Sequence, residues 1–295
     1  MQTRHRAAAT ALLLTATAGL AATGATAEAA GTHQTQARAA TSLTVKVMST
    51  KNGPKLSVQR IRPGFTTFTF VHKSGKAAQL EIVRLKSGYS LRHLLSDIPK
   101  LLGEPTHKLI HRVDNKVVFY GGGDVAAQGT TRTKIAVDID RSGTYYAVKV
   151  GKHPSAVALK ARGSHQKRTH PQADGILTIG AGNTWEPKGT LPHKGWIKTT
   201  NKAAEPHFID FMPVADSATD QDVADWFGNP SGPPTWFDGA RAQFEFGTEV
   251  VSPGHTVYWQ ARGDAGRFAI ACFYPSLHGG MPHAFMGMYL VVTLD

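Results

Sequence analysis

Cysteine is almost absent from this chain, which has one thiol, Cys272, in 295 residues. A single cysteine cannot form a disulfide within the chain, so an internal disulfide framework is excluded. An odd cysteine in an exported protein indicates a bond to another chain, a reactive thiol or a metal ligand. A small buried apolar side chain is the alternative. The choice depends on the residues around Cys272 and on the compartment.

The sequence also lacks an apolar run long enough to cross a membrane, so we expect no transmembrane segment. The N-terminus instead has the layout of a cleaved signal peptide, in which Arg4 and Arg6 precede small and apolar residues that end in an A-x-A triplet. We predict a signal peptide over residues 1–29, a polar leader over residues 30–41 and a secreted, extracytoplasmic mature protein. The absence of a cysteine near the cleavage site excludes a lipid anchor there.

The common enzyme motifs are missing. The sequence has no H-E-x-x-H zinc motif, no G-x-S-x-G nucleophile elbow and no phosphate-binding loop. The Gly121–Gly123 run is predicted to be a flexible turn. The acidic residues between positions 216 and 225 are predicted to be helix-start charges rather than an acid–base pair. We therefore predict that the protein is not an enzyme.

Acidic residues are scarce in the first part of the chain. Residues 1–170 have 26 Lys+Arg against 8 Asp+Glu, whereas residues 171–295 have 7 against 13. The overall net charge of +12 hides this asymmetry. The sequence has no nucleic-acid-binding motif, and export argues against a nucleic-acid partner. We expect either a solvated basic face or a first half that binds an anionic cell-envelope polymer.

Long stretches with helical periodicity are few, and short runs of alternating or continuous apolar residues dominate. Runs of this length, rich in β-branched and aromatic residues, are typical of strands. Examples are SLTVKVMS, FTTFTFVH, KIAVDI, TYYAVKV and MYLVVTL. The sequence therefore predicts an all-β protein.

The pattern of elements occurs twice along the chain. Residues 42–152 and 173–295 each contain a strand, a Lys-Ala-Ala segment, a short helix and a Gly-led strand in the same order. Ser90 is the predicted N-cap of the first helix, and Thr219, with an acidic residue three positions on, is that of the second. We predict two tandem β-sandwich domains, each with a short helix insertion, joined by a basic linker over residues 153–172.

The two copies differ at the positions that can carry chemistry. His207 in the second copy corresponds to Leu80 or Gln79 in the first, and Cys272 corresponds to Lys149. The first copy also lacks the His- and Met-rich ending. Metal chemistry is therefore expected in the second copy, and the first is predicted to be a metal-less scaffold or docking domain.

The end of the chain gathers soft ligands. Cys272 closes one predicted strand and Met288 opens the last one, with His283 on the loop between them. Strand ends at one pole of a β-sandwich lie close together, so His207 from an earlier strand is the natural fourth ligand. A His₂Cys set with a weak axial Met suits copper in electron transfer, whereas a thioether is an unusual ligand for zinc.

With these residues in place, the sequence resembles the cupredoxins, the Greek-key β-sandwich family that includes plastocyanin and azurin. The resemblance rests on NKAAEPHFIDF and CFYPSLHGGMPHAFMGMYLVVTLD in the second copy, and the first copy is similar only as a metal-less version. It implies two tandem Greek-key β-sandwiches and one copper per chain. It also implies Cys272 as the thiolate ligand, His207 and His283 as imidazole ligands and Met288 as the axial ligand.

The loop between Cys272 and His283 is longer than in plastocyanin-like domains. His278 gives a shorter reach, with Met281 three residues on, and is the alternative loop ligand. His283 is preferred because Met288 then lies directly against the last strand. The other methionines of the loop are either further Cu(I) contacts or filling of the core and loop.

Two functions from different classes are compatible with the sequence. The first is an exported copper protein that transfers electrons with an unknown redox partner or holds copper. The second is a non-catalytic cell-envelope interaction protein in which the Cys/His/Met cluster is packing. Oxidase and nitrite reductase activity are not expected, because multicopper oxidases need His-x-His pairs and a His-Cys-His segment, whereas Ala271 precedes Cys272.

Overall fold

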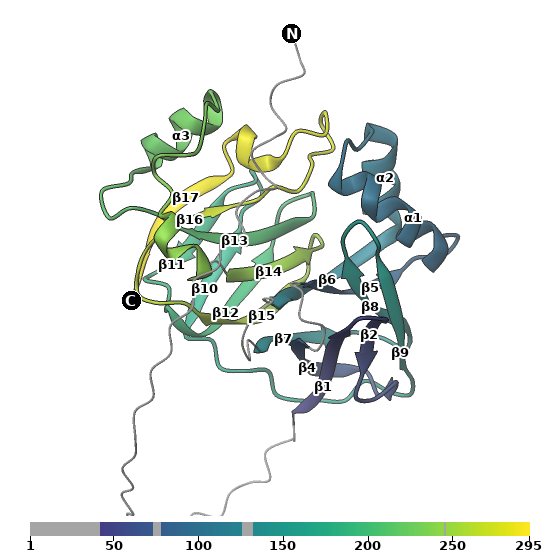
Figure 1. Cartoon of the computed structure of the whole chain (residues 1–295). Helices are drawn as coiled ribbons and strands as arrows, with labels where there is room; N and C mark the ends of the chain where they lie inside the picture. Colours follow the sequence, from purple (N-terminus) through teal and green to yellow (C-terminus); the bar gives the residue numbers. More distant parts are fainter. Residues whose placement is uncertain (1–41, 73–77, 126–131, 245) are drawn as a thin grey trace, which may run out of the picture.

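The computed structural model describes residues 42–72, 78–125, 132–244 and 246–295. The predicted signal peptide and leader, residues 1–41, lie outside the described residues. Strands dominate the described part of the chain (Figure 1), which confirms the all-β prediction. None of the described helices is long and apolar enough to span a membrane.

The described strands divide between the two halves of the chain. The first half contains β1 (Leu43–Thr50), β2 (Gly53–Leu56), β3 (Arg60–Ile61), β4 (Gly64–His72), β5 (Ala78–Leu85), β6 (Val117–Val125), β7 (Arg132–Ile139), β8 (Gly143–Val150) and β9 (Ser155–Ala161). The second half contains β10 (Gly175–Ile179), β11 (Trp185–Lys188), β12 (Lys194–Asn201), β13 (His207–Pro213), β14 (Phe246–Val251), β15 (Thr256–Arg262), β16 (Gly266–Ala271) and β17 (Tyr289–Leu294).

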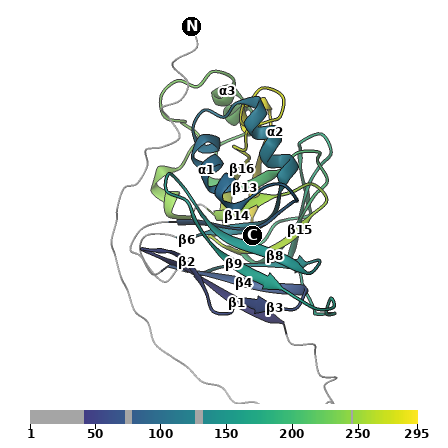
Figure 2. The same ribbon diagram turned by 90° about the vertical axis from the view of Figure 1, so that its right-hand side faces the viewer.

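The helices are short and lie between strands. They are α1 (Leu91–Leu102), α2 (His107–Lys116) and α3 (Asp220–Gly228), with 3-10 turns η1 (Gly239–Phe244) and η2 (His283–Met286). Figure 2 shows α1 and α2 on the side of β6 and β8 that faces away from β1 and β4.

The strands form two sheets, and each sheet runs through both halves of the chain. One has the order β11-β10-β12-β15-β7-β4-β1-β2, and the other has the order β17-β16-β13-β14-β6-β5-β8-β9-β3. The pairing of β15 with β7 and of β14 with β6 joins the halves edge to edge, which covers strand edges that are otherwise open to aggregation. The sheets pack around a shared core, in which the rings of Trp259 on β15 and Phe211 on β13 are 5.5 Å apart.

The strand order agrees with an internal duplication. Counted outward from the two junctions, β7-β4-β1-β2 matches β15-β12-β10-β11, and β6-β5-β8-β9 matches β14-β13-β16-β17. Each half therefore contributes the same eight strands to the two sheets, and the first half adds β3 beyond β9. The exact domain boundaries predicted from the sequence stay a prediction, because the sheets continue across the junction.

The strand registers identify the first-half counterparts of the candidate ligands. Asp210 pairs with the last residue of β16, and Glu81 holds the equivalent place against β8. Three residues before each lie His207 and Ala78. The counterpart of His207 is thus an alanine, one or two positions earlier than the sequence comparison placed it. Lys149 keeps the position of Cys272, six residues after the turn glycine in both halves.

The predicted helix starts are confirmed, but the first half has one helix more than expected. Ser90 accepts a backbone bond at the start of α1, and Thr219 and Asp222 form a reciprocal capping box at the start of α3. The additional helix is α2. Arg112 on α2 donates two hydrogen bonds, 3.0 and 2.8 Å long, to the carboxylate of Asp97 on α1, so the two helices are tied by a bidentate ion pair.

The Gly121–Gly123 run is not a turn, and this prediction was wrong. It lies inside β6, at the junction with β14. A Cβ on Gly122 would overlap the carbonyl oxygen of Leu80 and would lie 2.8 Å from Cβ of Glu249. Glycine is needed at Gly122 because the neighbouring strand β5 of the same half and a side chain of the second half both approach too closely to leave room for a Cβ.

The linker is shorter than predicted. Residues 155–161, placed in the linker from their charge and Gly/Pro content, form β9, which pairs with β8 and with β3. The strand lies near the edge of the sheet and keeps Lys160 exposed while Leu159 and Ala161 are buried. Charged residues on such a strand obscure the alternation of apolar and polar residues by which a strand is recognised in the sequence.

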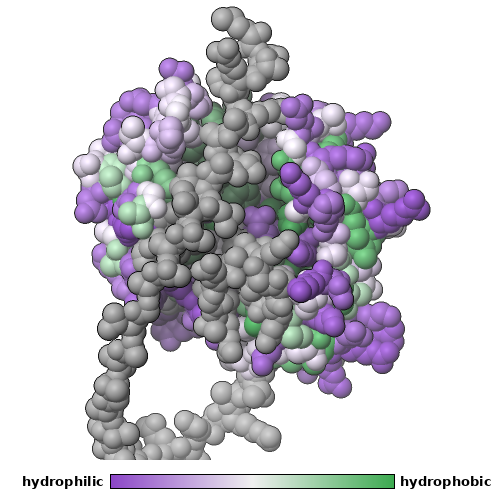
Figure 3. Space-filling view, in the orientation of Figure 1, coloured by the Kyte–Doolittle hydropathy of each residue, from purple (hydrophilic) through white to green (hydrophobic). Residues whose placement is uncertain are grey.

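One face of the first half carries many hydrophilic side chains among smaller hydrophobic patches (Figure 3). Figure 3 shows hydrophilic side chains gathered over the first-half elements, at the right of the view. This face belongs to the part of the chain with the surplus of Lys and Arg. Binding of an anionic cell-envelope polymer to this face stays a prediction.

Candidate metal centre

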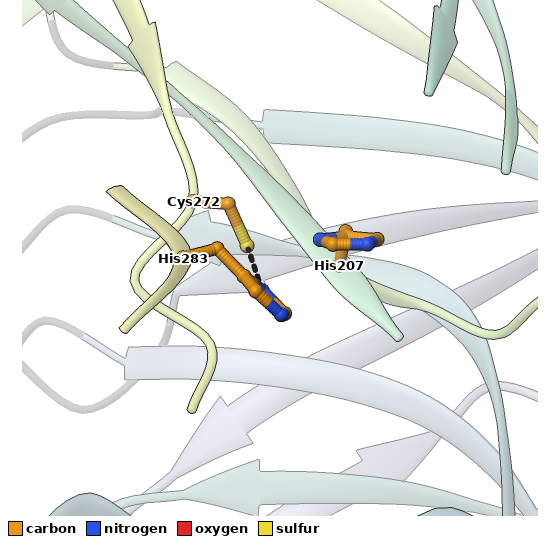
Figure 4. Close-up of side chains that lie close together, drawn as sticks. All are labelled: His207, Cys272 and His283. Atoms are coloured by element: carbon orange, nitrogen blue, oxygen red, sulfur yellow. Dashed lines mark hydrogen bonds between the residues drawn. The ribbon is translucent and has the colours of Figure 1, made fainter. Parts of the chain in front are cut away.

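Three of the predicted ligands lie together at one end of the second half. His207 opens β13, Cys272 follows the last residue of β16, and His283 opens η2. One ligand atom from each lies within 4.8 Å of the other two, and all three residues are fully buried. Figure 4 shows their side chains close together, with the thiol of Cys272 directed at the ring of His283. The three residues therefore lie together as the sequence analysis expected, and their role as metal ligands stays a prediction.

The loop between β16 and β17 folds back on itself and so brings His283 to Cys272. The amide of Ala284 donates to the carbonyl of Cys272 at 2.7 Å, and the amide of His283 donates to the carbonyl of Tyr274 at 3.1 Å. Pro275 and Pro282 form an isolated antiparallel bridge across the loop. The loop is long, but these contacts hold its two ends together as a much shorter turn would. The extra residues therefore do not separate His283 from Cys272.

The imidazole of His283 is fixed at both nitrogens. Its Nε2 is 3.1 Å from Oε2 of Glu205, and its Nδ1 is 3.6 Å from Sγ of Cys272. A neutral imidazole has one N–H. When that proton is on Nε2 and donates to the carboxylate, the Nδ1 lone pair faces the sulfur. Burial lowers the pKa of His283, although the carboxylate of Glu205 opposes this, so the ring is neutral and can act as a ligand.

The imidazole of His207 has one nitrogen without a partner. Its Nε2 is 3.2 Å from Oδ1 of Asn183, whereas its buried Nδ1 has no hydrogen-bond partner. Burial, with a smaller contribution from nearby His283, lowers the pKa of His207 to about 3. An unpaired polar atom in a protein core is costly and calls for an explanation. An unpartnered nitrogen on a ring whose centroid is 4.3 Å from that of His283, in a cluster that also holds a thiol, fits a metal ligand.

Cys272 is a neutral thiol in the metal-free chain. Burial raises its pKa to about 12, and backbone hydrogen bonds from Tyr274 and Phe208 only partly oppose this. A bound metal ion removes the proton from a coordinating thiol. Binding therefore exchanges the thiol proton for a cation, and the buried site gains a thiolate only together with the metal.

Glu205 and Asn183 are positioning residues that the sequence analysis missed. Glu205 is buried and accepts from His283 and, at 2.7 Å, from the amide of Leu277. It therefore fixes the ligand ring and the loop at once. The one sequence signal that could have identified Glu205 is its position two residues before His207, in Lys-Ala-Ala-Glu-Pro-His. No pattern in the sequence pointed to Asn183.

Asn183 has a backbone conformation suited to its role. It is the one non-glycine residue in the described chain with a left-handed backbone, at φ 56°. It lies in the turn between β10 and β11, where its amide donates to the carbonyl of Gly180. Asparagine tolerates this conformation better than most residues. The turn thus presents the side-chain oxygen to Nε2 of His207 and sets the tautomer that leaves Nδ1 free.

Replacing Asn183 by glycine is expected to weaken copper binding by about 10- to 100-fold, the usual cost of losing a hydrogen bond behind a metal ligand. Glycine keeps the left-handed turn, so the change removes the contact to His207 without backbone strain. Competition against a copper chelator measures the affinity. The matched control is Asn229→Gly, at the end of α3. Equal weakening by both variants would contradict the assigned role.

The structure also separates the two candidate loop ligands. His278 has a side chain that is 81 % exposed, and its Nε2 is 3.9 Å from Oε1 of Glu205, whereas His283 is fully buried beside Cys272. Met288 is 2 % exposed. Its amide donates to the carbonyl of His283 at 3.0 Å, so it lies directly after the ligand turn. Met281, by contrast, is 52 % exposed.

The cluster has the order of ligands expected of a cupredoxin, on the corresponding strand ends of a two-sheet β-fold. No family model matches the chain, and no curated protein matches it. Comparison with solved structures finds similarity to copper proteins. A reduced auracyanin from Roseiflexus castenholzii is 17% identical over 41% of this chain and 94% of that chain, with a TM-score of 0.25.

Two longer proteins are similar over more of the chain. Lac15 from a marine microbial metagenome is 12% identical over 78% of this chain, which spans 61% of that protein, with a TM-score of 0.26. A Cu-containing nitrite reductase from Thermus scotoductus is 11% identical over 86% of this chain and 68% of that chain, with a TM-score of 0.22. All three TM-scores are low, so the chemistry of the site must be judged from its own side chains.

Proposed function

We propose that this chain is an exported copper protein that holds copper, and transfers electrons through it, at a site formed by His207, Cys272, His283 and Met288. The observation that carries the proposal is the fully buried cluster of His207, Cys272 and His283, in which one ligand atom from each lies within 4.8 Å of the other two, together with the unpartnered Nδ1 of His207. Three such atoms are a mixed nitrogen and sulfur donor set.

The donor set suits copper better than the other common metals. Two imidazoles and a thiolate with a nearby thioether form the soft set found around copper in electron-transfer sites. Copper supplies a one-electron change between Cu(I) and Cu(II) when it is bound. Met288 is the proposed axial ligand because it is buried and follows the turn that holds His283.

The protein contributes rigidity and exclusion of water. All three clustered residues are fully buried, and two of them are held from behind by Asn183 and Glu205. Side chains that are already in place reorganise little when the charge on the site changes. The carboxylate of Glu205 also places a negative charge next to His283, which favours the more highly charged state of a bound cation.

The burial of His283 bears on how electrons leave the site. Its Nε2 points to a buried carboxylate rather than to solvent. The ring of Tyr274 is nearly parallel to that of His283, with 6.5 Å between the ring centroids. The Tyr274 hydroxyl donates a hydrogen bond of 2.6 Å to Oδ1 of Asp114 on α2. A redox partner would therefore exchange electrons through at least one further layer of side chains, of which Tyr274 is the candidate.

A copper titration of the purified mature chain tests the proposal. Visible absorption and EPR spectra are recorded at each addition of Cu(II). We expect an intense thiolate-to-copper band that saturates at one copper per chain. A colourless protein would overturn the proposal and would leave the Cys/His/Met cluster as core packing, which is the alternative function's prediction.

A further inference from the structure

A second pair of metal-binding side chains lies on α2, outside the centre described above. His107 and His111 are four residues apart, so both project from the same face of the helix. Their Nε2 atoms are 2.9 Å apart, and the rings are 4.2 Å apart between centroids at an interplanar angle of 70°. His107 is exposed and His111 is half-buried. Nothing in the proposed function uses them.

The separation of the two nitrogens fits a shared metal ion. Imidazole nitrogens bind Cu(II) or Zn(II) at about 2.0–2.1 Å. Two such nitrogens at a right angle, as in the square or tetragonal geometry that Cu(II) prefers, are about 2.9 Å apart. The same distance also suits an N–H···N hydrogen bond between the rings. The metal-free pair is therefore held, by its own hydrogen bond, at the separation that a metal needs, and a bound metal replaces that hydrogen bond after a small turn of the rings.

The helix beneath the pair is firmly anchored, so the backbone positions from which the two rings project are fixed. Thr106 caps its N-terminus by accepting from the amide of Leu109 at 3.3 Å. Leu109, Ile110 and Val113 are buried in the core. The bidentate ion pair from Arg112 ties the helix to α1. A preorganised pair of ligands loses less entropy on binding than two mobile ones.

The pair also lies on the helix that touches the loop of the buried centre. A Cβ on Gly280 would lie 3.4 Å from the carbonyl oxygen of Pro105 and 3.5 Å from Cδ1 of Ile110. Tyr274 of the same loop bonds to Asp114 of α2. Figure 1 shows this loop, between β16 and β17, reaching α2. A copper ion held on α2 would thus lie on the element that supports the loop carrying His283.

We propose that His107 and His111 form a surface site for Cu(II), distinct from the buried centre. Imidazole suits Cu(II), and Cu(II) binds a given set of nitrogen ligands more tightly than the other divalent ions of its series. Water completes the coordination, because the rings face solvent. The site takes copper without a thiolate, so it has no intense visible band. It does not depend on the buried centre for its existence.

Variants of the full-length mature chain test the site in a Cys272→Ser background, which removes the thiolate. Cu(II) is titrated and followed by EPR and by competition with a chelator. We expect one Cu(II) with a signal typical of nitrogen and oxygen ligands. His107→Ala and His111→Ala are each expected to weaken this binding by about tenfold or more, because one ligand of a linked pair is lost.

His93→Ala is the matched control. His93 is an exposed histidine on the neighbouring α1, and its ring lies against Tyr89 rather than against a second imidazole. It should leave the affinity unchanged. Equal affinities in all four proteins would overturn the surface site, whether or not the chain with Cys272 intact shows the intense band. Conversely, absence of the band in the copper-loaded chain with Cys272 intact, with the α2 site retained, would overturn the proposed function alone.

Discussion

Replacing Cys272 by serine is expected to abolish the intense visible absorption of the copper-loaded chain completely. The band requires a thiolate bound to Cu(II), and Cys272 is the only cysteine in the sequence. A serine hydroxyl is a poor ligand at neutral pH, so copper affinity at the buried centre should fall as well. Visible spectroscopy, together with a count of bound copper, measures both effects. Thermal unfolding of the metal-free variant shows whether the fold is retained.

The matched control for this variant is His278→Ala in the same loop. His278 is exposed, unlike His283, and its removal should leave the band intact. His283→Ala should lose the band, as Cys272→Ser does. If His278→Ala lost the band and His283→Ala kept it, the loop ligand would be His278, and the assignment of His283 would be wrong. If Cys272→Ser kept an intense band, the assignment of Cys272 as the thiolate ligand would be wrong.

Replacing His207 by glutamine is expected to change how the stability of the metal-free chain depends on pH. The pKa of His207 is lowered from 6.5 to about 3 in the folded chain. Below pH 6.5 the unfolded chain binds a proton at this residue and the folded chain does not. His207 therefore lowers the free energy of unfolding as the pH falls, by about 1.4 kcal/mol for each unit between 6.5 and 3.

The variant is needed because other groups act in the opposite direction. Burial raises the pKa of Asp114 to about 7. The folded chain therefore holds a proton there that the unfolded chain releases, and stability is lost as the pH rises from 3.8 to 7. The total curve mixes both effects. The difference between the parent and His207→Gln isolates His207.

Urea unfolding at a series of pH values, from 7 downward, measures this difference. We expect His207→Gln to gain stability relative to the parent as the pH falls, by a total of up to about 5 kcal/mol if the full shift is sampled. His255→Gln is a control for a histidine outside the cluster, because its pKa is also lowered by burial. A difference that does not vary with pH would show that His207 has an ordinary pKa.

Much of the fold could be predicted from the sequence because it depends on local patterns. Short apolar runs gave the strands, and the residues at Ser90 and Thr219 gave the helix starts. The repeated order of elements indicated a duplication. The sequence failed where a residue's conformation depends on a distant neighbour. The glycines of β6 resemble a turn until the carbonyl of Leu80 and the strand β14 are placed against them.

For the candidate site, too, one part could be predicted from the sequence and another could not. The types and order of His207, Cys272, His283 and Met288 were determined by the sequence alone, because strand ends bring such residues to one pole of a β-fold. Only the tertiary structure shows that His283, and not His278, is buried beside Cys272, because this depends on the contacts within the loop.

The supporting residues and the surface pair were also decided by the tertiary structure. Asn183 and Glu205 reach the ligand rings through turns and loops whose course no periodicity describes. The His107–His111 pair needed the helix α2, which the sequence did not predict. The sequence thus determined which donor atoms the chain carries. Packing decided which of them meet, because partners that hold an imidazole in place are close in space and distant along the chain.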